Sequence, residues 1–175
     1  AAHSIVQKLN EEQVADTAAS DEEAVLENKI AEYDAFLTKQ DPAFTVEELE
    51  EAMQKVMDQY AGGIGTHYQF NEKQLGMAEE KIKKLQILAK GLAAADMHEL
   101  MFIYELKERL TVCLTVIAHL RARKETRWHS FAENLDYPEK SDAWLCYVNS
   151  KKNGDQITMI RRDLVKGGET YEHRD

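Results

Sequence analysis

Apolar residues recur at steps of three and four along the first two thirds of the chain, which is the period of an α-helix. Short polar or glycine-containing segments separate these runs, so each run predicts its own helix. We expect four helices, over residues 21–40, 46–61, 72–92 and 97–123. Only a few residues separate the last two helices, which are therefore expected to pack as antiparallel partners.

Local signals at the helix ends support these bounds. Thr45-Val46-Glu47-Glu48 is a capping box, in which the Thr hydroxyl and the Glu carboxylate satisfy amide groups left bare at a helix start. Gly62-Gly63 follows that helix, and glycine adopts the left-handed conformation that ends a helix without steric cost. Asp96 is placed to cap the longest helix. Four methionines at helical spacing are expected to be core residues: Met53, Met57, Met97 and Met101.

The helical period disappears after Glu125, where the chain becomes aromatic and rich in turn residues. Two runs of strand-forming residues, 144–148 and 156–160, flank Asn153-Gly154, which is a hairpin signal. The predicted fold class is mainly α, with an antiparallel bundle of three to four helices followed by a small C-terminal β-hairpin. The expected organisation is a linker up to residue 20, a helical bundle over 21–125 and an aromatic, turn-rich segment with a hairpin over 126–175.

Composition and charge exclude several classes of function. The chain has 175 residues, enough for one domain with a core, and a formal net charge of −10. Residues 1–60 carry 15 acidic and 4 basic side chains. Such a chain repels phosphate backbones, so we expect no nucleic-acid partner. No apolar run approaches the roughly 18 residues that a membrane span needs. The two cysteines are far apart in the sequence, which favours a reducing, cytoplasmic location.

Familiar catalytic motifs are absent from the sequence. Gly62-Gly63-Ile64-Gly65 resembles a phosphate loop, but Tyr68 stands where the G-x-G-x-x-G motif needs its last glycine, and a helix precedes it. A di-iron bundle needs Glu-x-x-His pairs, and none occurs. Cys113 lies on the apolar side of the longest helix, where burial raises the pKa of a thiol and makes it unreactive. We therefore expect no catalytic, cofactor-binding or metal-ligating residue in this chain.

Basic and aromatic residues are mixed after the longest helix. Basic side chains stabilise the C-terminal end of a helix dipole, so this mixture is consistent with a solvated helix end. Arginine combined with tryptophan and tyrosine is equally typical of protein–protein contacts, because guanidinium groups stack on rings and bind carboxylates with two hydrogen bonds. The interface candidates are Arg121, Arg123, Glu125, Arg127, Trp128, Tyr137 and Trp144.

The order of several segments resembles a known family. The sequences MQKVMDQYAGGI (53–64), NEKQL (71–75) and DMHELM (96–101) are similar to the C-terminal helical region of adenylylsulfate reductase alpha subunits. Those subunits belong to the fumarate reductase and succinate dehydrogenase flavoprotein superfamily. The stretch RKETRW (123–128), followed by Asp136-Tyr137-Pro138 and Trp144, is similar to the R-x-E-[ST]-R…D-[YF]-P…W pattern that closes this superfamily. The resemblance covers residues 41 to 163.

The resemblance implies a helical domain of an FAD-dependent oxidoreductase, which packs on the flavin domain and helps to seat an iron–sulfur beta subunit. The whole enzyme would reduce adenylylsulfate to sulfite and AMP with two electrons, or run the reverse. Residues 1–9 would be the tail of the flavin domain and continue into the linker that ends at residue 20. The family's flavin contacts and catalytic residues lie upstream, so the chain alone is expected to bind no FAD and to be inactive.

Two alternatives remain open at this point. A fumarate reductase or succinate dehydrogenase-type paralogue would share the same helical region and act on another small acid. A stand-alone helical interaction module is suggested by the near-heptad apolar pattern of the two longest helices.

Overall fold

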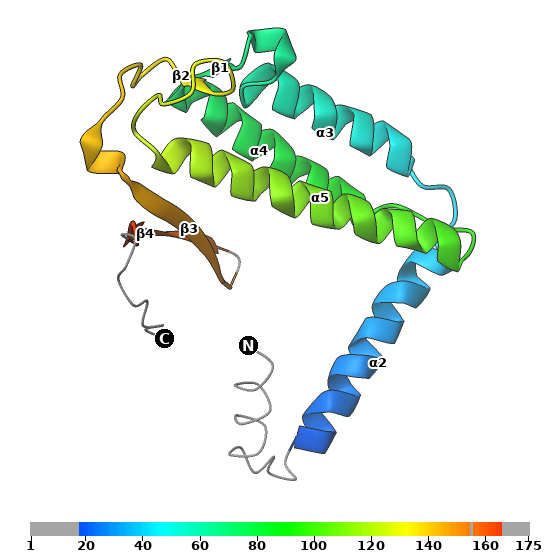
Figure 1. Ribbon diagram of the computed structural model, residues 1–175. Helices are drawn as coiled ribbons and strands as arrows, with labels where there is room; N and C mark the ends of the chain where they lie inside the picture. Colours follow the sequence, from blue (N-terminus) through cyan, green and yellow to red (C-terminus); the bar gives the residue numbers. More distant parts are fainter. Residues whose placement is uncertain (1–17, 155, 166–175) are drawn as a thin grey trace.

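The computed structural model describes residues 18–154 and 156–165, so the predictions for residues 1–17 lie outside the described part of the chain. Within that part the main elements follow the order helix, helix, helix, helix, hairpin (Figure 1). The helices are α2 (Ala18–Leu37), α3 (Val46–Tyr60), α4 (Glu72–Ala89) and α5 (Met97–Ala122). The hairpin consists of β3 (Cys146–Asn153) and β4 (Gln156–Asp163). The predicted fold class is therefore confirmed.

Helices α3, α4 and α5 form the core of the molecule. Figure 1 shows α4 and α5 side by side, with α3 packed above them. Among the core residues of α5, Ile103, Leu110 and Ile117 are at most 1% exposed. They meet Leu75, Ile82 and other apolar residues of α4. Burial of this continuous apolar layer is the main source of stability in such a bundle.

The predicted cap residues are in place. Thr45 accepts a hydrogen bond from the Glu48 amide while the Glu48 carboxylate accepts one from the Thr45 amide, which completes the capping box. Asp96 accepts from two amides at the start of α5. Gly62 has a φ of +76°, and a Cβ on Gly63 would come within 2.3 Å of the Asp58 Cα. A helix end and tight turn therefore require these glycines, as predicted, and no phosphate loop is needed to explain them.

The contacts of helix α2 with the bundle come from its second half, from Lys29 onward. There the Tyr33 ring packs edge-on against Tyr104 of α5, with 5.3 Å between ring centroids, and Phe36 is buried. The preceding turns leave the bundle (Figure 1). Leu26 and Ile30, which share the predicted apolar face with Tyr33, are 61% and 49% exposed. The helix is thus where the sequence predicts it, and half of its apolar face has no partner among the described residues.

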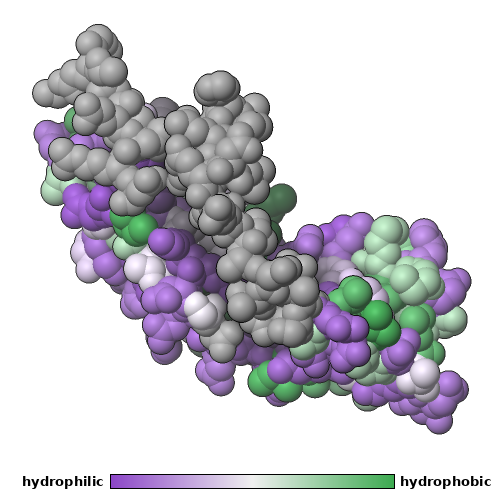
Figure 2. Space-filling view, turned by 90° about the horizontal axis from the view of Figure 1, so that it is seen from below, coloured by the Kyte–Doolittle hydropathy of each residue, from purple (hydrophilic) through white to green (hydrophobic). Residues whose placement is uncertain are grey.

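The predicted core position is wrong for two of the four methionines. Met53 is buried and Met57 packs against the core, but Met97 and Met101 are 63% and 47% exposed. Leu100 and Ile103 of the same helix are buried instead, so the side of α5 that enters the core does not include these two methionines. Figure 2 shows hydrophobic residues gathered at the right-hand end of the molecule, the side on which α2 meets α5 in Figure 1.

The C-terminal part combines the predicted hairpin with a pairing that the sequence did not indicate. β3 and β4 are antiparallel, and Asn153 pairs with Gln156 across the turn. Two very short strands, β1 (Gln69–Phe70) and β2 (Glu133–Asn134), pair in parallel. This second pairing connects the segment after α5 with the turn between α3 and α4.

Candidate functional site

The end of α5 brings the predicted interface candidates together. The helix stops at Ala122, and Arg123 leaves it with extended backbone angles, φ −84° and ψ 108°. Alternate side chains of extended backbone point to the same side. Arg123, Glu125 and Arg127 accordingly meet on one side, and Thr126 is buried on the other.

The carboxylate of Glu125 is the centre of this arrangement, and its side chain has no exposed surface. It accepts hydrogen bonds from Arg123 Nη1 at 2.6 Å, from Arg127 Nε at 2.9 Å and Nη2 at 2.8 Å, and from the Ser141 amide at 3.0 Å. Burial alone raises the pKa of Glu125, but these donors outweigh it and hold the pKa at about 2. We call these four residues, together with Trp144, the Glu125 cluster.

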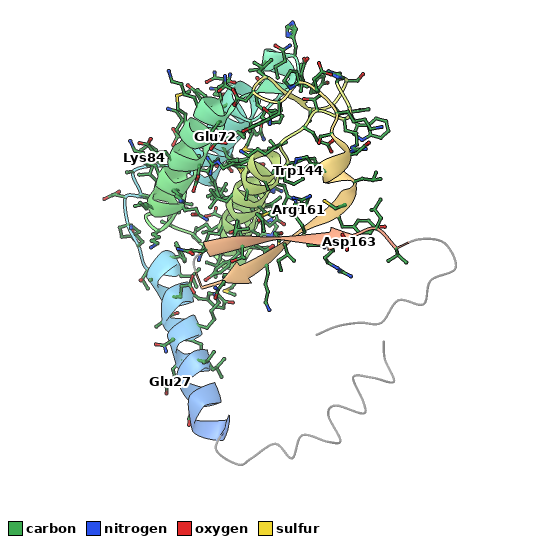
Figure 3. All side chains as sticks on the ribbon, turned by 90° about the vertical axis from the view of Figure 1, so that its left-hand side faces the viewer. Glu27, Glu72, Lys84, Trp144, Arg161 and Asp163 are labelled. Carbon is green, nitrogen blue, oxygen red and sulfur yellow. The ribbon has the colours of Figure 1, made fainter. Side chains whose placement is uncertain are left out.

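The Glu125 cluster ties the end of α5 to the hairpin. Arg123 also donates from Nη1 to the backbone carbonyl of Trp144, at 2.9 Å, and from Nη2 to that of Cys146, at 3.1 Å. The Trp144 ring has the guanidinium carbon of Arg161 4.3 Å from its centroid and that of Arg123 5.9 Å from it. Figure 3 shows Trp144 and Arg161 on the same side of the molecule as the hairpin. The arginines therefore make contacts within the chain.

The other residues of the closing sequence pattern also have structural partners. The buried Thr126 hydroxyl donates to the Tyr137 carbonyl and accepts from the Asn134 amide, both at 2.9 Å. The Asp136 carboxylate accepts from the Glu72 amide, at 2.7 Å, in the first turn of α4. A carboxylate at that position satisfies a bare amide and stabilises the helix dipole. The pattern R-x-E-T-R…D-Y-P thus holds α4, α5 and the hairpin in one arrangement.

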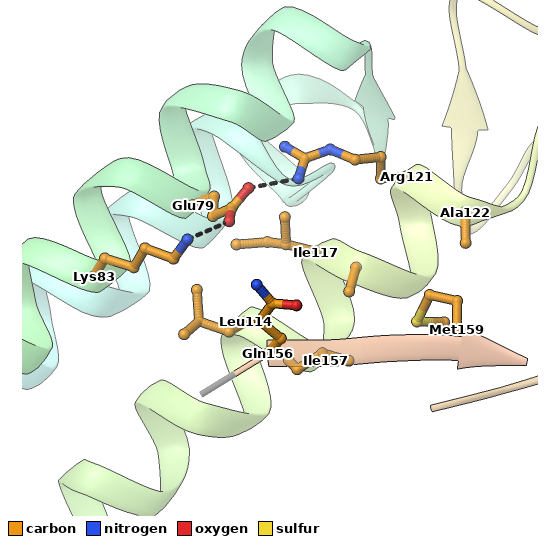
Figure 4. Close-up of a pocket in the computed structure, with 10 residues that line it drawn as sticks. Glu79, Lys83, Leu114, Ile117, Arg121, Ala122, Gln156, Ile157 and Met159 are labelled. Carbon is orange, nitrogen blue, oxygen red and sulfur yellow. Dashed lines mark hydrogen bonds and ion pairs between the residues drawn. The ribbon is translucent and has the colours of Figure 1, made fainter. Parts of the chain in front are cut away.

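Arg121 lies apart from the Glu125 cluster. It points toward α4, where it forms ion pairs with Glu72 and Glu79, and Lys83 also binds Glu79 (Figure 4). The pKa of Glu79 is lowered first by Lys83 and then by Arg121. These side chains border a pocket of about 430 Å³ between α4, α5 and β4. Because its charges pair with one another, the pocket is locally neutralised.

The remaining candidates, Trp128 and Tyr137, are accessible. Trp128 is 69% exposed, and Tyr137 is 42% exposed with the Lys124 ammonium 5.2 Å from its ring centroid. Trp128 stands beside an apolar groove of about 460 Å³ on α5, which we call the α5 groove. Its apolar lining comes from four parts of the chain: Val112, Val116 and Leu120 of α5, Trp128, Phe131 and Ala132 of the following segment, Phe70 of β1, and Val148 of β3.

The sequence reasoning missed the groove. Phe131 is 75% exposed and was not among the candidates, although it follows Trp128 by three residues. The available signal was the ten-residue stretch 111–120, which contains no acidic side chain, lysine or arginine. Exposed positions of a surface helix usually carry charged side chains, so an uncharged stretch of this length indicates a covered face.

Residues 18–154 and 156–165 do not combine the side chains that metal binding or thiol chemistry would require. No three His, Cys, Asp or Glu side chains there are grouped closely enough to hold a metal ion. The pKa of Cys113 is raised by burial, which keeps its thiol protonated. None of the described helices combines the length and hydropathy required to cross a membrane.

Comparison with known proteins identifies the class of the chain. Residues 50–169 match the family described as fumarate reductase flavoprotein C-term, and the chain belongs to that family. It is also 34% identical over 98 residues to the adenylylsulfate reductase subunit alpha of Megalodesulfovibrio gigas. That alignment covers 55% of this chain and 15% of the relative.

Solved structures agree with this assignment. The adenylylsulfate reductase of the hyperthermophilic Archaeoglobus fulgidus is similar over 86% of this chain, with 31% identity and a TM-score of 0.77. An adenosine-5-phosphosulfate reductase in complex with sulfite is similar over 81%, with 34% identity and a TM-score of 0.70. A quinol fumarate reductase of E. coli, 18% identical with a TM-score of 0.70 over 92% of the chain, shares the fold. The chain covers 26%, 24% and 27% of those three chains, respectively.

Proposed function

We propose that the chain is the C-terminal helical domain of an FAD-dependent oxidoreductase of the adenylylsulfate reductase type. The observation that carries the proposal is the identity of 31% and 34% to two solved reductases of this type, against 18% to the fumarate reductase that shares the fold. The proposed reaction is the two-electron reduction of adenylylsulfate, which breaks the bond between sulfur and the AMP oxygen and releases sulfite and AMP, or its reverse.

In this proposal residues 1–20 are the tail of the flavin domain and the linker. Residues 21–125 form the helical bundle, and residues 126–175 form the segment that carries the hairpin. The bundle packs on the flavin domain and supports an iron–sulfur partner subunit. Trp128 and Tyr137 are the candidates best placed for such contacts, because their rings are exposed. The proposed location is the cytoplasm.

FAD would be held by the rest of the polypeptide. The two arginines of the Glu125 cluster, Arg123 and Arg127, are already bound to the Glu125 carboxylate. The donor set of this cluster therefore does not fit a dinucleotide. When bound, the flavin supplies the electron-transfer chemistry, and this chain's residues supply support and orientation.

The test is to express the complete coding region that contains this chain and to measure bound FAD and turnover. We expect FAD in the complete polypeptide and electron transfer to adenylylsulfate in preference to fumarate. Reduction of fumarate alone would assign the chain to the fumarate reductase type. A coding region without a G-x-G-x-x-G segment upstream, or FAD bound by residues 1–175 alone, would contradict the proposal.

A further inference from the structure

The exposed surface of the second half of α5 combines Thr111 with the apolar side chains of Val112 and Val116. Residues 111–120 contain no lysine, arginine or acid, and one side of this stretch packs in the core through Ile117. The opposite side presents Val112, 59% exposed, and Val116, 40% exposed. Exposed helix positions in a chain with 31% charged residues normally carry charge. This surface therefore has the composition of a covered helix face.

Neighbouring segments complete this surface as a groove. The exposed rings of Trp128 and Phe131 stand at one border of the α5 groove, and Val148 of β3 stands at another. Grouped exposed apolar side chains of this kind mark an interaction site, whereas single ones do not. Aromatic side chains are also the residues enriched at the centre of protein interfaces.

The polar groups of the groove are few, and most of them are engaged within the chain. Thr115 donates its hydroxyl to the Thr111 carbonyl, Glu125 accepts from its arginines, and the His119 ring also lines the groove. Arg123 and Arg127 line it, but both are engaged by Glu125 and by backbone carbonyls. Among the described residues, the buried polar side-chain atoms without a hydrogen bond belong to Gln74 and Arg121, and neither lines the groove. Ligand sites hold their ligands with a few polar groups placed for that purpose. The composition of the groove favours an apolar protein segment.

We propose that the α5 groove is the docking site for an apolar segment of the flavin-binding part of the same polypeptide. This proposal rests on the proposed function and deepens it, because it places the contact at Val112, Val116, Trp128 and Phe131.

The relative lengths favour this occupant over a second copy. The chain spans about a quarter of the solved reductase chains that it matches, so most of such a polypeptide lies outside it. A covalently attached body is present at an effective concentration on the order of millimolar, at which a small groove suffices for docking. A second copy has no such advantage, and two chains of net charge −10 repel each other.

The shape of the molecule is consistent with a large occupant. Both α2 and the hairpin leave the bundle on the same side of α5 (Figures 1 and 3). The exposed turns of α2 carry a second apolar group, Val25, Leu26 and Ile30, at 68%, 61% and 49% exposure. A domain packed between α2 and the hairpin would cover this group.

Hydroxyl-radical footprinting with mass spectrometry tests the proposal directly. Residues 1–175 alone and the complete polypeptide are labelled under the same conditions. We expect labelling of Trp128 and Phe131 to fall at least about fivefold in the complete polypeptide, since side chains at an interface core lose nearly all their exposure. Ile87 of α4 is 66% exposed, lies outside the groove and serves as the internal control. Its labelling should stay the same.

A matched pair of variants separates docking from folding. Val112→Lys places a charge in the groove, and Ile87→Lys places one at a similarly exposed position of α4. In the complete polypeptide, V112K should restore the labelling of Trp128 to within about twofold of the isolated chain, because a buried unpaired charge opposes docking. I87K should leave Trp128 protected. Circular dichroism of both variants in the 175-residue chain should match the unsubstituted protein.

The outcomes are distinct. A complete polypeptide that binds FAD but leaves Trp128 as reactive as in the isolated chain would overturn the docking proposal and leave the proposed function intact. A complete polypeptide without FAD would overturn the proposed function instead. Protection of Trp128 in a dimer of the isolated chain, detected by sedimentation, would show that a second copy is the occupant and would also overturn the proposal.

Discussion

Arg127 binds the carboxylate of Glu125 through two hydrogen bonds, 2.9 Å from Nε and 2.8 Å from Nη2, although the two residues are only two positions apart in the sequence. The Glu125 side chain is completely buried, and the Arg127 side chain is 20% exposed. Both oxygens of the carboxylate are engaged, because Arg123 and the Ser141 amide also donate to them. A buried carboxylate with all its partners present is a strong structural constraint, and removing one member leaves an uncompensated charge.

Glu125→Gln should destabilise the isolated chain by about 3 kcal/mol, because it removes the negative charge between two arginines and replaces an acceptor with a donor. Urea denaturation followed by circular dichroism measures the change. Glu51→Gln is the control, since Glu51 forms an exposed pair with Lys55 at 2.7 Å. That substitution should change stability by less than about 0.5 kcal/mol. Equal effects of the two substitutions would show that Glu125 is not constraining the fold.

Acid should destabilise the chain through the same carboxylate. The pKa of Glu125 falls from its ordinary 4.5 to about 2 in the folded state, so folding favours the ionised form. Its contribution is present above pH 4.5 and is lost as the pH falls toward 2, amounting to about 3 kcal/mol. Urea midpoints measured across this range should decline. The urea midpoints should decline less steeply in the Glu125→Gln variant. Equal declines in the variant and the unsubstituted protein would refute the assignment of this acid sensitivity to Glu125.

Thr126→Val should cost about 2 kcal/mol, since it keeps the shape of the side chain and removes a buried hydroxyl that both donates and accepts. Thr111→Val is the matched control on the exposed side of α5, where the hydroxyl bonds only to the Lys107 carbonyl. We expect its effect to stay below about 0.5 kcal/mol. Thermal unfolding of the three proteins gives the comparison. A neutral Thr126→Val would mean that water or another group replaces the hydroxyl.

Tyr104→Ala should release α2 without unfolding the bundle. The Tyr104 ring contacts Tyr33 and lies 4.6 Å from the Lys29 ammonium and 4.4 Å from that of Lys107. Both lysines also bind Glu32 of α2. Hydrogen exchange should show loss of amide protection in α2 with α4 and α5 unchanged. Tyr60→Ala, which removes another ring with a lysine above it, should leave α2 protected.

The helices and the hairpin could be predicted from the sequence because local signals determine them. Thr45, Asn71 and Asp96 each cap the helix that the apolar period begins, and Asn153-Gly154 forms the hairpin turn. The pairing of β1 with β2 could not be predicted, because each strand has two residues and they meet only through contacts 64 positions apart.

The interface role of the candidate residues stays a prediction. The mixture of arginine, glutamate and tryptophan after α5 indicated the segment that forms the Glu125 cluster, but not the burial of Glu125, which depends on Ser141 reaching back to it. Met97 and Met101 show the same limit, since helical spacing predicts a common face but does not say whether another element covers it. Tertiary contacts decide which faces of a helix are covered. For the same reason, helical spacing alone could not predict that Val112 and Val116 are exposed in the groove.

The central claim is that this chain works as one domain of a larger flavoenzyme. An antibody raised against residues 1–175 can isolate the natural polypeptide from the source cells under native conditions. The account predicts a polypeptide several times larger than 20.1 kDa with the two-banded absorption of bound flavin. A colourless polypeptide of about 20.1 kDa would contradict it.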